Sequence, residues 1–287
     1  MKTLIPLLAA WLIMTSLSGQ TEVIPGGQFS VVTYNVAGLP SWINDLDTDR
    51  FDPMGEKLNA FDIVLVQEDF WYHDLLTANM DFPYMSPPKI NTWGEWLWLY
   101  LVNDGLNRFS RFPMSEVKRH PWDSCHDYNV SGGNGSDCFA RKGFSFASHT
   151  LTAENGEEVR LDIYNLHMES SHTDEGNLIR AAQVEILAEE MQKLSGDNAV
   201  ILVGDFNFSK GRMPGLYQKL IEATELTDAF TALRKTDKWT VDRIFFRSSK
   251  QLKLTPVKAQ TLRFNENGMT LSDHSPKMVQ FNWRLEE

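Results

Sequence analysis

Short runs of apolar residues, rich in β-branched and aromatic side chains, recur along this chain and predict β-strands. Two of these runs alternate apolar and polar positions, as half-buried antiparallel strands do. Residues 177–194 differ, because their apolar side chains recur at helical spacing and predict an amphipathic helix that packs on a sheet. The expected strands are 29–36, 61–68, 143–151, 159–167, 199–203, 241–246 and 277–283. So many strands predict an α/β fold in which two packed β-sheets are flanked by helices.

The N-terminus has the pattern of a secretory signal peptide. Lys2 precedes an apolar segment, 4–14, and small residues follow up to Gly19. The apolar segment is shorter than the roughly 20 residues that cross a bilayer, so cleavage is favoured over a permanent anchor. We therefore expect residues 1–19 to be a signal peptide and the mature protein to be secreted, either to the exterior or to a periplasm.

Residues 20–287 are expected to form one catalytic domain, because no linker, internal repeat or low-complexity tract divides them. The formal net charge is −11 at pH 7, and such a surface repels nucleic acid at long range. A nucleic-acid partner is therefore disfavoured. It stays open as an alternative, because a bound divalent metal can reverse the field inside a cleft.

Polar residues suited to binding metal or phosphate stand at the ends of several predicted strands. They are Asn35, Glu68, His167, Asp205 with Asn207, and Asp273 with His274. Side chains two residues apart on a strand point to the same face, which groups Asp205 with Asn207. Mg²⁺ prefers oxygen ligands and usually takes only one or two carboxylates from a protein. We therefore predict that Asn35, Glu68 and Asp273 bind Mg²⁺.

The same residues suit the cleavage of a phosphodiester, in which a water loses a proton and a leaving oxygen is stabilised. His274 is expected to act as the general base, with Asp242 holding its other ring nitrogen. Asp205 and Asn207 are expected to orient the water or to hydrogen-bond the phosphoryl oxygens, while His167 adds a hydrogen bond or a proton. The alternative for each histidine is a buried side chain that only satisfies its own hydrogen bonds.

The two cysteines, Cys125 and Cys138, flank a segment rich in Gly, Ser and Asn. In an exported chain we expect them to form a disulfide, which would stabilise the fold by about 3 kcal/mol. The alternative is a pair of free thiols. A zinc site is disfavoured, because His126 alone adds little to two sulfurs.

Five motifs stand in the order and approximate spacing of a known family. They are Thr33-Tyr34-Asn35, Gln67-Glu68, Asn165-Leu166-His167, Gly204-Asp205-Phe206-Asn207 and Ser272-Asp273-His274. Over essentially the whole mature chain, the sequence resembles the endonuclease/exonuclease/phosphatase superfamily, whose members look like deoxyribonuclease I. The resemblance implies a four-layered α/β sandwich of two mixed β-sheets flanked by helices. It also implies Mg²⁺-dependent phosphoester hydrolysis, with Mn²⁺ or Co²⁺ as substitute metals.

The resemblance assigns roles to the same residues. It implies Glu68 as the principal metal ligand with Asn35 nearby, and His274 as the general base supported by Asp242. The same resemblance implies that Asp205 and Asn207 contact the attacking water and the scissile phosphate.

Two further stretches, 104–113 and 140–144, look like the secreted neutral sphingomyelinases of that superfamily. A disulfide often precedes the second stretch in those enzymes, and Cys125 and Cys138 stand in that place. This resemblance implies a sphingomyelin phosphodiesterase of the phospholipase C type, which releases phosphocholine and ceramide. It further implies a phospholipid substrate, transient peripheral contact with a membrane surface, and a monomer. Arg111 and Lys142 are either phosphate contacts or solvated surface charges.

The expected membrane contact has no obvious docking element. Bacterial sphingomyelinases typically carry an aromatic hairpin before the final Asp-His pair, but 250–269 contains only Phe264 as an aromatic. The segment 93–100 is another candidate, with Trp96, Trp98 and Tyr100 on one face of a strand. Those rings belong either at a lipid interface or in a buried aromatic core.

Two rival functions stay open. A secreted, deoxyribonuclease I-like endonuclease would use the same catalytic residues, although the net charge disfavours it. The other rival is a non-catalytic surface-binding module on the same fold. The full set of polar strand-end residues argues against such a module, which would not need all of them.

Overall fold

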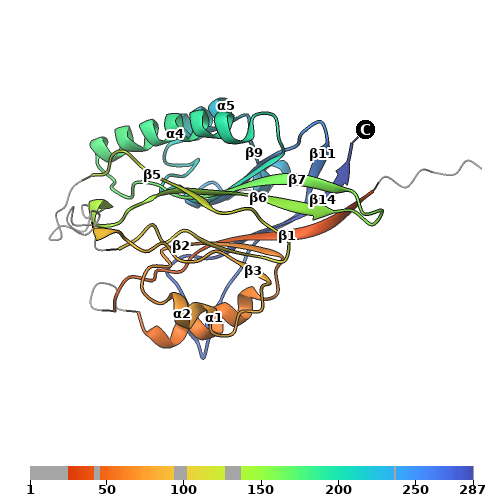
Figure 1. Ribbon diagram of the computed structural model, residues 1–287. Coiled ribbons are helices and arrows are strands. Elements are labelled where there is room, and N and C mark those ends of the chain that lie inside the picture. The colour runs from red at the N-terminus through yellow and green to blue at the C-terminus, as the bar shows by residue number, and fades with distance from the viewer. Residues whose placement is uncertain (1–24, 42–45, 94–101, 127–136, 236, 287) are drawn as a thin grey trace, which may run out of the picture.

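The chain folds into four layers, in which two β-sheets lie face to face and helices cover their outer faces (Figure 1). This computed structural model describes residues 25–41, 46–93, 102–126, 137–235 and 237–286. The expected signal peptide and the tryptophans at 96 and 98 lie outside the described residues. The predicted four-layered α/β sandwich is confirmed.

Six strands form the first sheet, in the spatial order β11, β14, β1, β2, β4, β3. They are β11 (Leu252–Thr261), β14 (Lys277–Leu285), β1 (Gly26–Asn35), β2 (Ile63–Gln67), β4 (Asn107–Ser110) and β3 (Tyr84–Met85). Among the described strands of this sheet, only β1 and β2 pair in parallel, so the sheet is mixed. The carboxyl ends of β1 and β2 therefore lie at the same edge of this sheet.

The second sheet also has six strands, in the order β5, β6, β7, β8, β10, β9. They are β5 (Lys118–Pro121), β6 (Gly143–Thr152), β7 (Glu158–His167), β8 (Val200–Asp205), β10 (Asp242–Arg247) and β9 (Thr227–Asp228). Here β7 and β8 are the parallel pair. A small separate hairpin joins β12 (Asn265–Glu266) to β13 (Met269–Thr270).

The helices divide between the two outer faces (Figure 1). The first sheet is covered by α1 (Phe51–Leu58) and α2 (His73–Thr77), and the second by α4 (Asp174–Ser195) and α5 (Pro214–Thr224). Shorter turns are α6 (Ala229–Ala232) and two 3₁₀ turns, Thr48–Arg50 and Asp137–Phe139. In the described ranges, no helix combines the length and apolar character needed to cross a membrane.

Apolar side chains are buried on both faces of each sheet. On β1, Val31 packs into the core between the sheets, whereas Val32 packs into the core under α1 and α2. The inter-sheet core also includes Phe281 and Ile201, and a third core lies between the second sheet and α4 with α5. Burial on both faces explains why several strands read as continuous apolar runs rather than alternating ones.

The structure corrects two expected boundaries and adds a strand that the sequence pattern did not predict. Helix α4 begins at Asp174 rather than 177, because the Thr173 hydroxyl accepts a hydrogen bond from the Gly176 amide at 3.1 Å and caps the first turn. The strand expected over 61–68 spans only Ile63–Gln67, since Glu68 has left-handed backbone geometry with φ of 56°. Strand β11 was not expected, because Pro256 interrupts its apolar pattern where the register with β14 shifts.

Candidate active site

The polar residues predicted from the strand ends meet at one edge of the two sheets. Asn35 ends β1, Glu68 follows β2, His167 ends β7, Asp205 ends β8, Asp242 begins β10 and His274 lies just before β14. The parallel pairs β1–β2 and β7–β8 place their carboxyl ends together. Strand β10 runs antiparallel to β8, so its first residue, Asp242, pairs directly with Asp205. Residues from both sheets therefore share one site.

Asn35 links the two sheets through its side-chain amide. Its Nδ2 donates to Glu68 Oε1 at 2.9 Å and to Asp205 Oδ2 at 3.2 Å. Its Oδ1 accepts from the Ala37 backbone amide at 3.0 Å. The amide nitrogen thus bridges two carboxylates, while the oxygen that a metal would require is already hydrogen-bonded. Metal ligation by Asn35 stays a prediction.

The backbone at Glu68 is held in place by the segments that contain Gly38 and Gly105. The Glu68 carbonyl accepts hydrogen bonds from the amides of Gly38 and Phe70, each at 2.9 Å. Gly105 has a φ of 61°, and a Cβ added there would lie 2.9 Å from Glu68 Cα and 2.6 Å from the Phe70 ring. Glycine is required at 105 both by the left-handed conformation and by this close approach.

The Glu68 carboxylate lies in an environment that disfavours its charge. Burial raises the pKa of Glu68 above its usual value, and the charge of Asp205 acts in the same direction. Lys142, the Asn35 hydrogen bond and His274 oppose that rise. The side chain keeps 20% of its surface exposed, so it remains accessible from the edge of the sheets.

His274 and Asp242 form a hydrogen-bonded pair. His274 Nδ1 lies 2.9 Å from Asp242 Oδ2 and 3.1 Å from Oδ1, while its Nε2 lies 3.8 Å from Asp205 Oδ2. Burial alone would lower the pKa of His274, but the hydrogen bond and charge of Asp242, with Asp205 and Asp273, raise the pKa to about 10. The carboxylate fixes the ring so that Nε2 is directed to the shared edge.

His167 is fully buried and lies between the carboxylates. Its Nε2 is 3.6 Å from Asp205 Oδ2 and 3.8 Å from Glu68 Oε1. Burial, together with the charges of Lys142 and His274, holds the pKa of His167 well below its usual value. The imidazole is therefore neutral at neutral pH and is suited to hydrogen bonding rather than to carrying a charge.

The donor set fits a hard divalent cation. Ligand atoms of Asp205, Asp242 and His274 lie within 4.8 Å of one another, and the Glu68 carboxylate shares the Asn35 amide with Asp205. Oxygen donors of this kind suit Mg²⁺. The His274 nitrogen that faces Asp242 is already engaged, which leaves Glu68 and Asp205 as the better-placed ligands. A bound cation would also relieve the burial cost of the Glu68 charge.

Asp273 lies at the exposed side of the site. Its Oδ1 is 3.3 Å from the Ser272 hydroxyl, and within the described residues no hydrogen bond or ion pair joins it to Asn35 or Glu68. Ser272 itself donates to the Asn35 carbonyl at 2.8 Å and accepts from the His274 amide at 3.1 Å. Ser272 therefore ties the histidine loop to β1, and the metal role of Asp273 stays a prediction.

Asn207 follows the strand end rather than continuing it, with a φ of 52°. Its backbone amide donates to Asp205 Oδ1 at 2.9 Å, and its Nδ2 donates to the Met168 carbonyl at 2.8 Å. The residue thus connects the chain after Asp205 to the chain after His167. Its expected contact with a phosphate stays a prediction.

Arg50 is a supporting residue that the sequence did not reveal. Its guanidinium donates to the carbonyls of Val36, Ala37 and Leu271, and so joins the end of β1 to the loop that carries His274. A single arginine before a helix gives no sequence signal for such a role. Arg111, in contrast, binds the Asn59 carbonyl and Asp81 at the far end of β2 and does not join the site.

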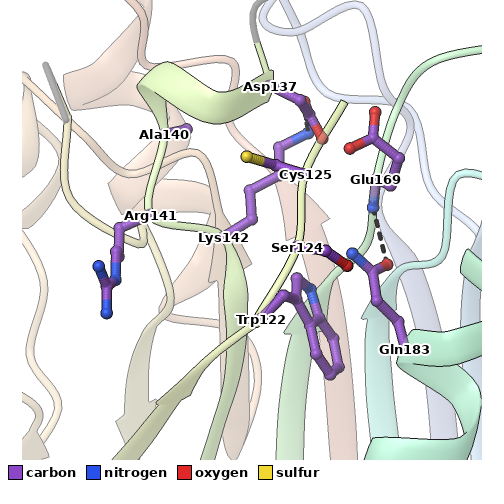
Figure 2. Close-up of a pocket in the computed structure, with 9 residues that line it drawn as sticks. All are labelled: Trp122, Ser124, Cys125, Asp137, Ala140, Arg141, Lys142, Glu169 and Gln183. Carbon is purple, nitrogen blue, oxygen red and sulfur yellow. Dashed lines mark hydrogen bonds and ion pairs between the residues drawn. The ribbon is translucent and has the colours of Figure 1, made fainter. Parts of the chain in front are cut away.

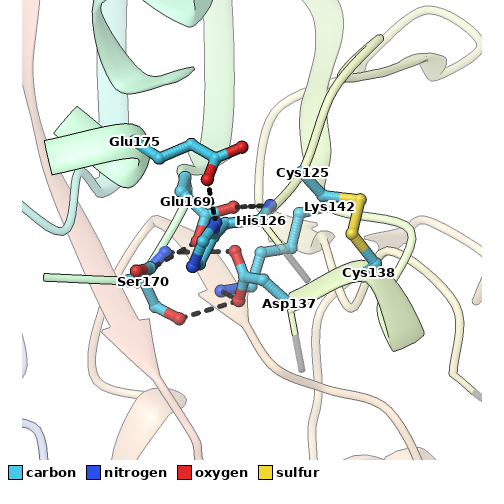
Figure 3. Close-up of a disulfide and its surroundings, with 9 residues drawn as sticks. Cys125, His126, Asp137, Cys138, Lys142, Glu169, Ser170 and Glu175 are labelled. Atoms are coloured by element: carbon cyan, nitrogen blue, oxygen red, sulfur yellow. Dashed lines mark hydrogen bonds and ion pairs between the residues drawn. A yellow bond between two sulfur atoms is a disulfide. The ribbon is translucent and has the colours of Figure 1, made fainter. Parts of the chain in front are cut away.

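Cys125 and Cys138 form the predicted disulfide, with a Cα–Cα distance of 5.2 Å. The bridge lies beside the partly buried ion pair of Asp137 and Lys142 (Figure 3). The Lys142 amine also lies 3.5 Å from the Met168 carbonyl, and its charge lowers the pKa values of Glu68 and His167. Lys142 is therefore a partly buried ion-pair partner close to the site rather than a solvated surface charge.

A small cavity of about 20 Å³ lies behind the site, lined by Trp122, Asp137, Lys142, Glu169 and Gln183 among others (Figure 2). The Trp122 indole donates to the His167 carbonyl at 2.7 Å, and the Glu169 amide donates to Gln183 Oε1 at 3.0 Å. These contacts pack the disulfide region against the strand that ends at His167.

A comparison with protein families matches residues 32–274 to the model described as the Endonuclease/Exonuclease/phosphatase family. The chain belongs to this family. The match begins in β1 and ends at His274, so it includes every residue of the site described above.

Among curated proteins, the chain is 32% identical over 279 residues to the sphingomyelinase of Mycobacterium tuberculosis. The alignment covers 90% of this chain but 53% of the mycobacterial protein, so the chain spans about half the length of that relative. The resemblance to sphingomyelinases that the motifs indicated is confirmed.

Solved structures show the same fold. A crystal structure of beta toxin from Staphylococcus aureus with bound magnesium ions superposes with a TM-score of 0.63 at 20% identity, over 88% of this chain and 99% of that chain. Sphingomyelinase C from Streptomyces griseocarneus superposes with a TM-score of 0.61 at 16% identity, over 88% and 99%. At these identities the likeness shows the fold alone.

Proposed function

We propose that this protein is a secreted, Mg²⁺-dependent phosphodiesterase that hydrolyses sphingomyelin to phosphocholine and ceramide. The His274–Asp242 pair is the main support for phosphodiester hydrolysis. The Nε2 atom of His274 faces Asp205, at the edge of the sheets where Glu68 also lies. The relationship to mycobacterial sphingomyelinase supports the lipid substrate. The Cys125–Cys138 disulfide supports secretion, because disulfides form and persist in oxidising compartments.

Hydrolysis begins with the removal of a proton from a water that attacks the phosphorus. His274 accepts that proton at Nε2, and Asp242 stabilises the resulting imidazolium through Nδ1. Asp205 lies between the two histidines and orients the attacking water. A bond from the water oxygen to phosphorus forms as the bond from phosphorus to the ceramide oxygen breaks, which gives phosphocholine. The ceramide oxygen leaves and takes up a proton from solvent, and His274 releases to solvent the proton that it accepted.

Glu68 and Asp205 would hold the Mg²⁺ ion, with Asn35 fixing their relative position. The ion would supply positive charge that stabilises the negative charge of the phosphate and of the leaving oxygen, and it would lower the pKa of His274 toward the range where the ring accepts a proton. His167, neutral and buried, donates a hydrogen bond to a phosphoryl oxygen or to the leaving ceramide oxygen.

The test is hydrolysis of sphingomyelin vesicles and of double-stranded DNA by the purified protein, in parallel. Each substrate is incubated with Mg²⁺, with excess EDTA, and with Mg²⁺ restored. The His274→Ala variant serves as the control for contaminating enzymes.

Release of phosphocholine that EDTA stops and Mg²⁺ restores, with DNA intact, is the expected result. Cleavage of DNA without phosphocholine release would instead place the chain among secreted endonucleases. Failure to cleave either substrate, in a folded protein, would support a surface-binding module.

A further inference from the structure

Two loops that continue the catalytic strands carry an exposed tryptophan among basic residues. One loop follows Asp205 at the end of β8, and the other leads into Asp242 at the start of β10. The loops are joined where the Phe206 amide donates to the Val241 carbonyl at 3.0 Å and the Gly211 amide donates to the Lys238 carbonyl at 2.7 Å. Both loops therefore lie at the same edge as the active site.

Trp239 is 60% exposed, yet it is held in place. Its ring rests on the backbone of Gly211, where an added Cβ would lie 2.6 Å from Trp239 Cε3. The Lys238 amine lies 5.1 Å from the centre of the same ring. An exposed aromatic that is already ordered loses little conformational entropy when a partner covers it.

The surroundings of Trp239 are basic in a chain whose net charge is −11. Lys210, Arg212 and Lys238 are all exposed, and within the part of the chain that the structure describes none of them forms an ion pair with a carboxylate. Asp237, the nearby acidic residue in sequence, is neutralised by Lys277 at 2.6 Å. We call the set of Lys210, Arg212, Lys238 and Trp239 the basic rim.

We propose that the basic rim docks the protein on an anionic phospholipid bilayer, beside the active site; this rests on the proposed lipid substrate. At physiological salt, charges act over about 8 Å, so the acidic surface farther away has little effect at the rim. The neighbouring Asp205 and Asp242 are buried, whereas the three rim cations are exposed to a docked bilayer. Trp239 supplies an amphipathic ring of the kind that sits at the level of lipid headgroups.

A bilayer fits the rim better than a nucleic acid does. Binding to DNA is dominated by many phosphate contacts, whereas the rim offers three cations on an acidic protein. A fixed apolar ring adds binding energy at a lipid interface even when no base is present to stack on it. Docking here would bring Asp205 and Asp242 to the membrane surface that contains the substrate.

The test measures binding to vesicles without hydrolysis, in the presence of EDTA. Vesicles of phosphatidylcholine alone are compared with vesicles that also contain phosphatidylserine, at low and high salt. The variants are Trp239→Ala and the double reversal Arg212→Glu with Lys238→Glu. The matched control is Lys250→Glu with Lys253→Glu, since these exposed lysines lie near the opposite end of β10.

The wild-type protein and the control are expected to bind the anionic vesicles and to be released by salt. Each rim variant is expected to lose at least about tenfold in binding. Equal binding by the rim variants and the control would overturn the proposal, and so would binding of duplex DNA in preference to anionic vesicles.

A second measurement separates docking from catalysis. Sphingomyelin is presented in neutral detergent micelles, where the rim variants should keep the wild-type rate.

Micellar hydrolysis with no vesicle binding would overturn docking while leaving the proposed function intact. Vesicle binding with no hydrolysis in micelles would leave docking intact but contradict the proposed function. Loss of micellar hydrolysis in the rim variants alone would show that Trp239 and its neighbours only support the catalytic loops, which would also overturn docking.

Discussion

The Nδ1 atom of His274, in the loop before β14 of the first sheet, lies 2.9 Å from Oδ2 of Asp242, which begins β10 of the second sheet. This contact raises the pKa of the histidine and directs its other nitrogen toward Asp205. The catalytic chemistry of the site therefore depends on how the two sheets pack.

The substitution Asp242→Asn should lower the pKa of His274 from about 10 toward its ordinary value, because the amide supplies no negative charge. A ring with a lower pKa is deprotonated at lower pH, so the acid limb of the pH–rate profile should move to lower pH. The maximal rate should fall by about 10² or more, since the imidazolium loses its partner. Nuclear magnetic resonance titration of the imidazole without Mg²⁺ measures the shift directly.

Asp74→Asn, at an exposed position on α2, is the control for that experiment. An unchanged imidazole titration in Asp242→Asn would contradict the assigned pairing.

The substitution Glu68→Gln should abolish Mg²⁺ binding and lower phosphodiester hydrolysis by about 10³, because the amide cannot neutralise the cation. The fold should survive, since burial already disfavours the charge of Glu68. Calorimetric titration with Mg²⁺ and thermal unfolding check the two expectations. Glu116→Gln, at an exposed position, should change neither. Activity at the wild-type level in Glu68→Gln would remove this residue from the site.

The substitution Gly105→Ala should destabilise the protein by about 1–3 kcal/mol and weaken Mg²⁺ binding. Its new Cβ would strike the Phe70 ring and the Glu68 backbone, which holds the carboxylate in place. Gly156→Ala is the matched control, because Gly156 also has a positive φ but nothing lies within 4 Å of the added atom. The control should cost only the backbone penalty and leave Mg²⁺ binding unchanged. Equal effects on Mg²⁺ binding would show that the contact with Glu68 is unimportant.

The substitution His149→Leu should reduce the loss of stability in acid. Burial, with the charge of Arg108, lowers the pKa of His149 to about 3. In the unfolded chain, the imidazole of His149 binds a proton near pH 6.5. Below that pH, protonation therefore favours the unfolded state. The stability of the folded protein falls until the pH reaches the folded-state pKa of His149. Between pH 7 and pH 4.5 the wild-type protein should therefore lose about 2–3 kcal/mol more than the variant.

Denaturant unfolding at several pH values measures that difference. His172→Leu, at an exposed position, should leave the acid-side slope as it is in the wild type. A His149→Leu slope equal to the wild-type slope would contradict the assigned neutral state.

Much of the site follows from local sequence pattern. Asn35, His167 and Asp205 each follow an apolar run, and strand geometry alone places them at strand ends. The motif order then indicated the family, which the match over residues 32–274 confirmed. Local pattern also located the disulfide, because two cysteines in one short segment leave a single pairing.

Other features were beyond any local pattern. Arg50 holds three carbonyls that belong to segments far apart in sequence. The strand β11 was not predicted, because Pro256 interrupts its apolar pattern. The proline is tolerated because β11 is at the edge of its sheet. Trp239 could not be placed on Gly211 from sequence, since they belong to different loops.

The sequence by itself determined which segments become strands and helices and which chemistry stands at their ends. The reason is that periodicity and chain order are local properties. Only the tertiary structure decided that the Asn35 amide bridges Glu68 and Asp205, that His274 pairs with Asp242, and that Lys142 is partly buried near the site. The Asn35–Asp205 and His274–Asp242 contacts join residues from two sheets, so they exist only once the inter-sheet core has formed.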